Sequence, residues 1–441
     1  MKDLYKEHVR QLQNKYEAIL ETLERDGQPI EAVLLHSGTE SYYFADDIHI
    51  PFRTVPHFAH WLPLQGPDHL LLVQPGKKPF LIKHVPKDFW YEVPDSRNEY
   101  WMEEFDIVEV DSLDKLSAFL PDDLSGTAYI GDNEAFASSI GIELIAPRKL
   151  MTRLDFARSI KTPYEVECTR QAAAKAARGH LAAAQAFREG ASEYEIHIRY
   201  LMACEATDSQ MPYNTIVALD EKAAILHYQN KRGRGATTGN LLLIDAGARV
   251  NGYCSDITRT YLREGQDSLF YGILNRMEDL QSSLVEMVKP GVDYVELHRE
   301  AHRGVARILS ETGLVRLSPE EIFERGYTQP FFPHGLGHLL GIQVHDVSGH
   351  YADEDGSLLL PPKEYPFLRF TRKIVAGNLF TIEPGFYFIP MLLEPFRNSQ
   401  HSIDFDWETI DRLTPLGGIR IEDDIFVTEE GYENLTRPYL P

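Results

Sequence analysis

Apolar and polar residues alternate with the period of a helix over the first 25 positions of the chain. This spacing predicts an amphipathic opening helix with Asp3 as its N-cap. The apolar face of that helix would consist of Tyr5, Val9, Leu12, Tyr16, Ile19 and Leu23. Short apolar runs bounded by turn residues follow, and they predict the strands of a small α/β domain: AVLLHSG, HLLLVQPGKKPFLIKH and TAYIGDN.

The strongest helix signal of the chain lies at residues 162–190. Thr162 is suited to cap this helix, because Pro163 then takes the first helical position and Glu165 completes a capping box. Gly190 marks its end. We therefore place the start of a second domain just ahead of this helix.

Three further helices are predicted by the same cap chemistry, at Ser192 with Glu195, Asp293 with Glu296, and Ser318 with Pro319 and Glu321. Strand-like runs lie between and after these helices: NLLLIDAGARV, YCSDITRTYL, NLFTIEPGFYF and GGIRIEDDIFVT. Together the patterns predict an α/β (α+β) fold with two domains, residues 1–157 and residues 158–441. The second domain would be a sheet covered by helices.

Composition narrows the classes of function. A chain of 441 residues with 43% hydrophobic and 25% charged residues is typical of a globular protein that is long enough for two domains. Its net charge of −23 argues against a nucleic-acid partner or an anionic membrane surface. Its three cysteines form no C-x-x-C pair, and no run of about 18 apolar residues occurs. We expect a cytoplasmic protein.

Two aspartates are predicted to share one face of a hairpin. Asp245 ends the apolar run LLLI, where a carboxylate is costly unless it is paired or bound to a metal. Asn251-Gly252 is a strong signal for a two-residue hairpin loop, and such a loop puts Asp256 opposite Gly247. Asp245 and Asp256 then form a diagonal pair about 7 to 8 Å apart at Cα, which is close enough to hold cations between the side chains.

Two glutamates occupy similar positions. Glu383 ends a strand just before Pro384, and period-2 alternation puts Arg420, Glu422 and Asp424 on one strand face. Any one of these acids taken alone is more often an exposed charge or an ion-pair partner. Four of them on apolar strands of one domain favour a metal site.

The segment FPHGLGHLLG, residues 332–341, carries two histidines four positions apart. Pro333, Gly335 and Gly337 disfavour a helix, so a two-histidine zinc clamp on a helix is not expected. In an extended segment His334 and His338 lie about 13 Å apart, so at most one of them should bind a given ion. The glycines would let the backbone approach the site, and two ordinary loop histidines remain the alternative.

Taken together, these motifs resemble the creatinase, aminopeptidase P and prolidase family. The resemblance rests on Asp245-x10-Asp256 and on PHGLGH, VHD, TIEPG and GIRIED, which begin at residues 333, 344, 381 and 418. It covers the second domain motif by motif and the first domain only in general architecture. It implies a small creatinase-like N-terminal domain, a "pita-bread" metallopeptidase domain, and five metal ligands: Asp245, Asp256, His338, Glu383 and Glu422.

Within that family the chain looks most like bacterial prolidases, which are Xaa-Pro dipeptidases, and like the similar organophosphorus acid anhydrolases. Arg369 takes the place of the arginine that binds the terminal carboxylate of the substrate in prolidases. The long segment from Pro384 to Ile421 resembles their extended loop. The family also implies a homodimer.

The resemblance implies two Mn²⁺ ions per subunit, with Co²⁺ or Zn²⁺ as possible substitutes. Asp256 and Glu422 would bridge the ions, with Asp245 on one ion and His338 and Glu383 on the other. A hydroxide between the ions would attack the peptide bond of an Xaa-Pro dipeptide, and Glu383 would carry the proton to the departing prolyl nitrogen.

Five further residues are assigned by the same resemblance. His334 and His345 would hold the tetrahedral intermediate and the leaving side, and Arg420 would orient Glu422. Tyr213 and His227 would line the substrate pocket, although a core tyrosine and a strand histidine are equally compatible with the sequence. Phosphotriesters and fluorophosphates would be secondary substrates. The alternatives left open are an aminopeptidase P acting on longer Xaa-Pro peptides and a non-catalytic binding protein on the same fold.

Overall fold

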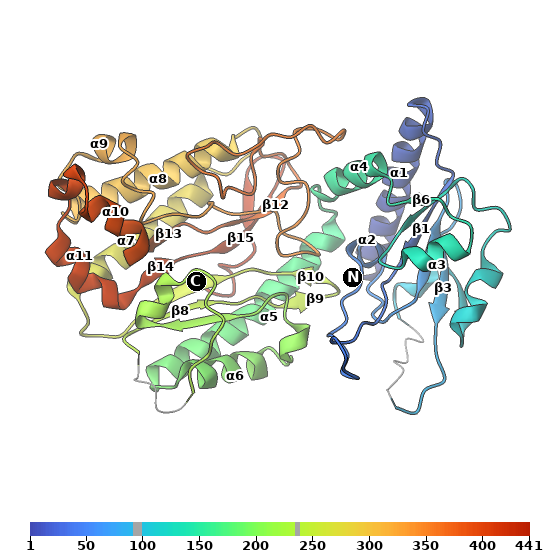
Figure 1. Cartoon of the computed structure of the whole chain (residues 1–441), viewed down its shortest axis with the longest axis horizontal. Coiled ribbons are helices and arrows are strands. Elements are labelled where there is room, and N and C mark those ends of the chain that lie inside the picture. The colour runs from blue at the N-terminus through green and yellow to red at the C-terminus, as the bar shows by residue number, and fades with distance from the viewer. Residues whose placement is uncertain (91–98, 234–238) are drawn as a thin grey trace. The chain divides into compact units, whose positions relative to one another are not determined.

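The computed structural model describes residues 1–90, 99–233 and 239–441, which divide into two compact units (Figure 1). The first unit comprises Met1–Arg158, Thr162–Glu165 and Asp353–Ser357. The second comprises Ser159–Lys161, Val166–Ala352 and Leu358–Pro441. Within the described ranges no helix combines the length and the apolar character that a membrane span requires.

The first unit is built on a six-stranded mixed sheet with the order β4-β3-β2-β1-β5-β6. Its strands are β1 (Ala32–His36), β2 (Leu70–Val73), β3 (Phe80–His84), β4 (Asp106–Val110), β5 (Thr127–Ile130) and β6 (Leu144–Ile145). Its helices are α1 (Lys2–Arg25), α2 (Pro56–Trp61), α3 (Glu134–Ser139), α4 (Arg148–Arg158) and the 3₁₀ turns η1 (Met102–Glu104), η2 (Leu113–Lys115) and η3 (Ser117–Phe119). The three predicted strand runs all form strands of this sheet.

The opening helix α1 buries the predicted apolar face, but the prediction of its cap is wrong. Met1 is the N-cap residue, and Asp3 lies within the first turn. A carboxylate there still faces the positive end of the helix dipole, so Asp3 favours the helix start without capping it.

The four helices predicted after the opening helix all form, and most of their residues lie in the second unit: α5 (Pro163–Arg188), α6 (Glu193–Ala203), α8 (Tyr294–Glu311) and α9 (Pro319–Glu324). The second unit also contains α7 (Ser268–Glu286), α10 (Pro390–Arg397), α11 (Trp407–Leu413) and the 3₁₀ turns η4 (Asp208–Gln210), η5 (Asp220–Ala224), η6 (Gln400–Asp404) and η7 (Thr414–Leu416). Ser192 and Ser318 form the predicted capping boxes. Asp293 caps α8 through the backbone of Val295, whereas Glu296 pairs with Arg299.

The strands of the second unit form several small sheets. They are β7 (Ile216–Leu219), β8 (Leu241–Asp245), β9 (Arg249–Val250), β10 (Tyr253–Cys254), β11 (Thr258–Leu262), β12 (Leu379–Ile382), β13 (Gly385–Tyr387), β14 (Gly418–Arg420), β15 (Asp423–Val427) and β16 (Tyr432–Asn434). The sheets are ordered β11-β8-β7, β12-β15-β16, β10-β9 and β13-β14. An isolated bridge between Thr258 and Glu422 joins the first two of these sheets.

Strand β8 is buried on both faces, which explains its continuous apolar run. Leu241 and Leu243 pack into the core shared with α7 and α8, whereas Leu242 and Ile244 pack into the core shared with α5 and α6. Figure 1 shows the sheet lying between these two helix pairs. Asp245 follows directly, at the point where the strand emerges from its apolar surroundings.

The predicted hairpin register is correct. Val250 pairs with Tyr253, and the same register continues to Asp245 opposite Thr258. Asp256 therefore falls opposite Gly247, as the hairpin loop required. An added Cβ at Gly247 would lie 1.9 Å from the carbonyl oxygen of Ser255, so only glycine allows the two backbones to approach this closely.

Candidate metal centre

Asp245 and Asp256 reach the same side chain, which demonstrates that the hairpin brings them together. The hydroxyl of Tyr213 lies 2.7 Å from Asp245 Oδ1 and 2.5 Å from Asp256 Oδ1. A phenol has one proton to donate, so the two carboxylates share it. Arg420 donates from Nη2 to Asp245 Oδ2 at 2.7 Å, so Asp245 has a cationic partner.

His338 and Glu383 come from adjacent segments that are paired along β12. Thr381 N–H donates to the carbonyl of His338 at 3.0 Å, and Glu383 N–H donates to the carbonyl of Leu336 at 2.8 Å. A Cβ on Gly337 would lie 2.0 Å from Thr381 O. The glycine therefore allows the close backbone approach that the sequence led us to expect.

The ring of His338 presents a lone pair to the acids. Its Nδ1 lies 3.0 Å from the carbonyl of Leu339, which can only accept, so Nδ1 carries the hydrogen. Its Nε2 then faces Asp256 Oδ2 at 3.4 Å and Glu383 Oε1 at 3.7 Å. Three acceptors facing one another require a proton or a cation between them.

Glu422 joins this group from the link between β14 and β15. Thr258 donates its hydroxyl to Glu422 Oε2 at 2.6 Å, and the Glu422 side chain is almost fully buried. Ligand atoms of Asp256, His338 and Glu422 all lie within 4.8 Å of one another. These three residues form a compact donor set of two carboxylates and one imidazole.

The electrostatics of the cluster show a shortage of positive charge. Burial raises the pKa of Glu383 to about 7, with repulsion from Asp256 and Asp245 adding to the effect. Burial, followed by repulsion from neighbouring acids, also raises the pKa of Asp256 and holds that of Glu422 well above its ordinary value. A buried, oxygen-rich set of this kind fits hard divalent cations such as Mn²⁺, which would supply the missing charge.

His334 lies beside the acids, and other groups occupy both of its ring nitrogens. Its Nδ1 donates to the carbonyl of Gly335 at 2.8 Å, so its Nε2 accepts from the hydroxyl of Tyr387 at 2.9 Å. Arg420 in turn donates to that hydroxyl oxygen at 2.8 Å. His334 Nδ1 also lies 3.8 Å from Glu383 Oε2, so His334 and His338 approach the two oxygens of one carboxylate. The segment that carries them is not helical, as predicted.

The remaining predicted residues surround the cluster. The ring of His345 packs edge-on against that of His338, with centroids 4.4 Å apart. Burial lowers the pKa of His345 to about 3, and the nearby charges of His338, Arg369 and His227 lower it further. Arg369 and His227 are both exposed. They therefore face solvent on the side of the cluster where His345 lies.

Arg420 contacts a different acid from the one expected. It bonds directly to Asp245, and it reaches Glu422 only through the hydroxyl of Thr258, which lies 3.3 Å from Arg420 Nε. The sequence reasoning also missed Tyr387 and Thr258. Thr258 could have been found, because it lies two residues beyond Asp256 on the same hairpin arm and so shares its face. Tyr387 had no such signal.

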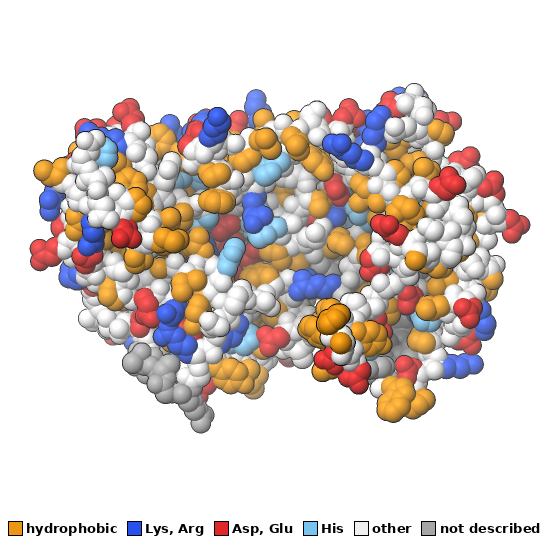
Figure 2. Space-filling model, viewed as in Figure 1, with side chains coloured by type: hydrophobic (Ala, Val, Ile, Leu, Met, Phe, Trp, Pro, Cys, Tyr) orange, Lys and Arg blue, Asp and Glu red, His pale blue; other side chains and the backbone are white. Residues whose placement is uncertain are grey.

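Side chains of this chemistry reach the surface of the second unit. Figure 2 shows histidine, basic and acidic side chains exposed side by side on the face it displays. Direct contacts link seven of the predicted site residues: Tyr213, Asp245, Asp256, His334, His338, Glu383 and Arg420. Glu422 lies close by, with a carboxylate oxygen within 4.8 Å of the ligand atoms of Asp256 and His338. His345 joins by ring contact, and His227 and Arg369 act on it through their charge.

Comparison with known proteins identifies the family of the chain. Residues 167–429 match metallopeptidase family M24, and residues 3–156 match the N-terminal domain of Xaa-Pro dipeptidase. The Xaa-Pro dipeptidase of Pseudoalteromonas atlantica is 44% identical over 438 residues, 99% of this chain and 98% of that protein. The Xaa-Pro dipeptidase of Shewanella pealeana is 40% identical over 435 residues, 98% of this chain and 97% of that protein.

Solved structures support the same fold. Escherichia coli aminopeptidase P with the inhibitor Pro-Leu superposes with a TM-score of 0.72 at 23% identity, covering 98% of this chain and 95% of that one. The zinc-substituted form of the same enzyme with product gives a TM-score of 0.71 at the same identity and coverage. The expected α/β architecture with a pita-bread second domain is thus confirmed. The chain belongs to metallopeptidase family M24, in the group of creatinase, aminopeptidase P and prolidase.

Proposed function

We propose that this protein is a metal-dependent dipeptidase that hydrolyses Xaa-Pro dipeptides. One observation carries the proposal. The buried donor set of Asp256, His338 and Glu422 lies in a chain that is 44% identical, over almost its full length, to a protein named Xaa-Pro dipeptidase. A catalytic role is favoured over a binding role because a purely structural core would not retain several buried acids short of positive charge.

The proposed cofactor is a pair of Mn²⁺ ions per subunit, with Co²⁺ or Zn²⁺ as substitutes. Asp245, Asp256, His338, Glu383 and Glu422 would hold the ions. The position of His338 supports this assignment, since Nε2 faces Asp256 and Glu383 while its other nitrogen is already bonded. When bound, the ions would supply a Lewis acid for the scissile carbonyl and would lower the pKa of the attacking water.

The side chains of the cluster have separate proposed tasks. Glu383 would receive a proton and pass it to the departing prolyl nitrogen. Arg420 would hold Asp245 and, through Tyr387, fix the ring of His334. His334 and His345, both held neutral by burial, would contact the substrate.

The preference for a dipeptide would come from Arg369. Its guanidinium is exposed and close enough to lower the pKa of His345, so it can meet a carboxylate bound beside that ring. Tyr213 and His227 would line the remainder of the substrate pocket. A longer peptide has no carboxylate at its proline, so it would lose this contact. An aminopeptidase P would show the opposite preference.

The decisive experiment measures hydrolysis of Ala-Pro and Ala-Pro-Ala by metal-stripped protein reconstituted separately with Mn²⁺, Co²⁺ and Zn²⁺. We expect no turnover without metal and the fastest turnover of Ala-Pro with Mn²⁺. Faster cleavage of Ala-Pro-Ala would identify an aminopeptidase P instead. Two results together would refute an enzyme of this class. Hydrolysis of Ala-Pro by the stripped protein would not rise when Mn²⁺ is added, and Asp256→Ala would hydrolyse Ala-Pro as fast as the parent does.

Organophosphate triesters and fluorophosphates are proposed as secondary substrates. A phosphorus(V) centre with a good leaving group presents the same water with a tetrahedral electrophile, so the same cluster can attack it. The relevant measurement compares kcat/KM for a fluorophosphate with that for Ala-Pro on one preparation. A larger value for the fluorophosphate would reverse the proposed order of substrates.

We also propose a cytoplasmic homodimer with two functional domains, residues 1–157 and 158–441. The three cysteines are buried, and no disulfide joins them within the described residues, as suits a reducing compartment. The segment 42–50 exposes large apolar side chains, and such patches usually mark an interface: Tyr42, Tyr43, Phe44, Ile48 and Ile50. Light scattering coupled to size exclusion should give a mass of twice 50.4 kDa, and a monomer at micromolar concentration would contradict this proposal.

A further inference from the structure

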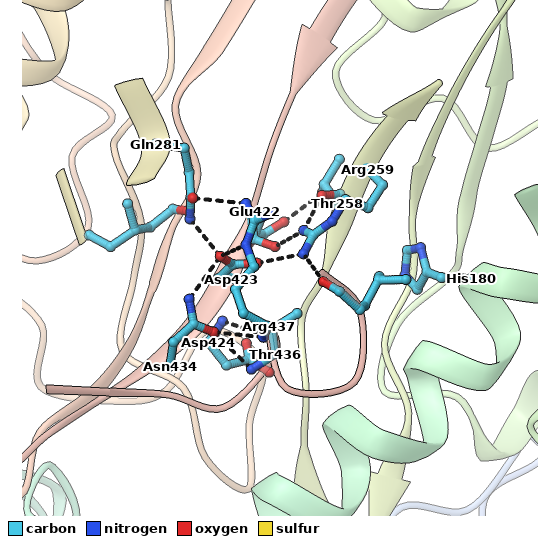
Figure 3. Close-up of polar contacts among 12 residues, drawn as sticks. His180, Thr258, Arg259, Gln281, Glu422, Asp423, Asp424, Asn434, Thr436 and Arg437 are labelled. Carbon is cyan, nitrogen blue, oxygen red and sulfur yellow. Dashed lines mark hydrogen bonds and ion pairs between the residues drawn. The ribbon is translucent and has the colours of Figure 1, made fainter. Parts of the chain in front are cut away.

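A buried carboxylate on β15, next to Glu422 in the chain, is the centre of a dense polar network. Asp423 is completely buried and accepts four hydrogen bonds (Figure 3). The donors are Arg259 Nη2 at 2.8 Å, Gln281 Nε2 at 2.9 Å, Asn434 Nδ2 at 2.9 Å and Arg437 Nε at 2.7 Å. None of these residues is in the predicted site.

The network also holds the backbone of the proposed ligand. Arg259 Nη1 donates to the carbonyl of Glu422 at 2.8 Å, and its Nη2 donates to the carbonyl of Leu440 at 2.9 Å. The preceding residue on β11, Thr258, donates its hydroxyl to the carboxylate of Glu422 at 2.6 Å. Arg259 and Thr258, which are consecutive on β11, therefore bond to the backbone and to the side chain of Glu422.

Strand geometry explains why this matters for the site. Successive side chains of an extended chain point to opposite faces, so Asp423 points away from the cluster when Glu422 points into it. Anchoring Asp423 with four hydrogen bonds fixes the backbone dihedrals at this point. The direction of Glu422 is then set before any ion arrives.

The next residue extends the same support to a second proposed ligand. Asp424 is fully buried, and its carboxylate accepts the backbone N–H of Asp256 at 3.1 and 3.3 Å. The three consecutive residues 422–424 thus have separate roles. Glu422 is a proposed ligand, Asp423 anchors the strand, and Asp424 holds the backbone of the other proposed ligand, Asp256.

The charges of the network are paired within it. Arg259 and Arg437 both form ion pairs with Asp423, at 2.8 and 2.7 Å. Arg437 also pairs with Glu278 at 3.1 Å, so the two guanidinium groups meet two carboxylates.

We propose that Arg259, Asp423 and Arg437 are positioning residues that preset Glu422 and Asp256 for binding the metal pair. The inference rests on the proposed function, because it concerns the affinity of that metal site. The network touches neither the substrate nor the ions. It acts through the backbone of the ligands, which is how outer hydrogen bonds raise metal affinity in other sites.

The test uses Arg259→Lys and Asp423→Asn in the full chain. Lysine keeps a positive charge beside Asp423 but loses the fork that also reaches the carbonyl of Glu422, and asparagine removes the charge with little change of shape. Glu433→Gln is the matched control. Glu433 lies on the neighbouring strand β16 and pairs with Arg170 of α5, and this ion pair does not touch Glu422. Unfolding curves measured by circular dichroism identify a temperature at which every variant is folded, and the metal titrations are done at that temperature.

The readouts are calorimetric titration of metal-stripped protein with Mn²⁺ and the paramagnetic resonance spectrum of the bound ions. We expect both variants to bind Mn²⁺ about 10- to 100-fold more weakly, with an altered spectrum, and the control to match the parent. If Asp423→Asn does not fold, Arg437→Gln replaces it, because Arg437 lies nearer the surface and also loses a bond to Asp423.

Three results would overturn the inference. Parent-like affinity and spectrum in the folded variants, with only the unfolding temperature lowered, would mean that the network merely stabilises the fold. The same loss of affinity in the Glu433→Gln control would show that any weakening of this sheet has the effect. Absence of Mn²⁺ binding by the parent would refute the proposed function itself, and with it this inference.

Discussion

Gly247→Ala tests the close packing of the hairpin that brings Asp245 and Asp256 together. A Cβ at Gly247 would lie 1.9 Å from the carbonyl oxygen of Ser255 and 3.1 Å from Pro212 Cγ. The first contact is with backbone, which cannot rotate away as a side chain can. The two hairpin arms must therefore separate where Asp256 lies opposite this glycine.

The cost can be worked out from the contacts that this separation breaks. Overpacking a tight site costs about 1 to 3 kcal/mol. The flanking hydrogen bonds, from Ala246 N–H to Ile257 O and from Ser255 N–H to Ala248 O, are both 3.0 Å long. Weakening them adds about 1 kcal/mol each, for roughly 3 to 5 kcal/mol in all. That corresponds to a fall of roughly 5 to 9 °C in the unfolding midpoint of the second unit.

Thermal unfolding followed by circular dichroism, together with a Mn²⁺ titration, would measure both consequences. Mn²⁺ affinity should fall at least about 10-fold, because Asp256 moves relative to Asp245. Gly431→Ala is the control, since a Cβ there meets nothing within 4 Å. A Gly247→Ala protein with the stability and Mn²⁺ affinity of the control would refute the reasoning.

Three further predictions concern residues around the cluster. Lys161 and Asp346 form a buried ion pair 2.5 Å long beside His345, so Lys161→Met should cost about 3 to 5 kcal/mol in thermal unfolding, and adding Asp346→Asn should recover part of it. Burial lowers the pKa of His302 to about 3, so the unfolded chain takes up a proton below pH 6.5 that the folded chain does not. Stability should therefore fall by up to about 1.4 kcal/mol per pH unit from pH 6.5 down to 3, and a denaturation series in which His302→Gln has the same slope would contradict this. Arg369→Met should raise KM for Ala-Pro about 10- to 100-fold with a smaller change in kcat, and an unchanged KM would remove Arg369 from substrate binding.

Local patterns predicted most of the secondary structure correctly. The capping boxes at Ser192 and Ser318 and the turn at Asn251-Gly252 each depend on residues within four positions of one another, so the sequence contains all that is needed. Asp3 was wrongly placed as a cap because any Asp, Ser or Thr near a helix start satisfies the same local rule. The rule does not distinguish the cap from the first turn.

Local patterns predicted only part of the site, because they carry information about residues that are close in sequence. The pairing of Asp245 with Asp256 follows from a hairpin register that the sequence contains. The family resemblance, and not the spacing, grouped these acids with His338, Glu383 and Glu422. The direct partner of Arg420 was missed because Asp245 lies 175 positions away in the chain.

By itself the sequence determined the course of the opening helix, the helices that begin with a capping box, the apolar strands, the register of the hairpin and the non-helical course of the two-histidine segment. These features depend on neighbours along the chain, so periodicity and turn chemistry specify them. Only the tertiary structure decided that Tyr387 links Arg420 to His334, and that Arg259 and Arg437 meet at Asp423. Those contacts join strands and loops that are distant in sequence. The spacing of apolar residues along a helix or strand indicates which of its faces is buried, but it does not indicate which distant element packs against that face.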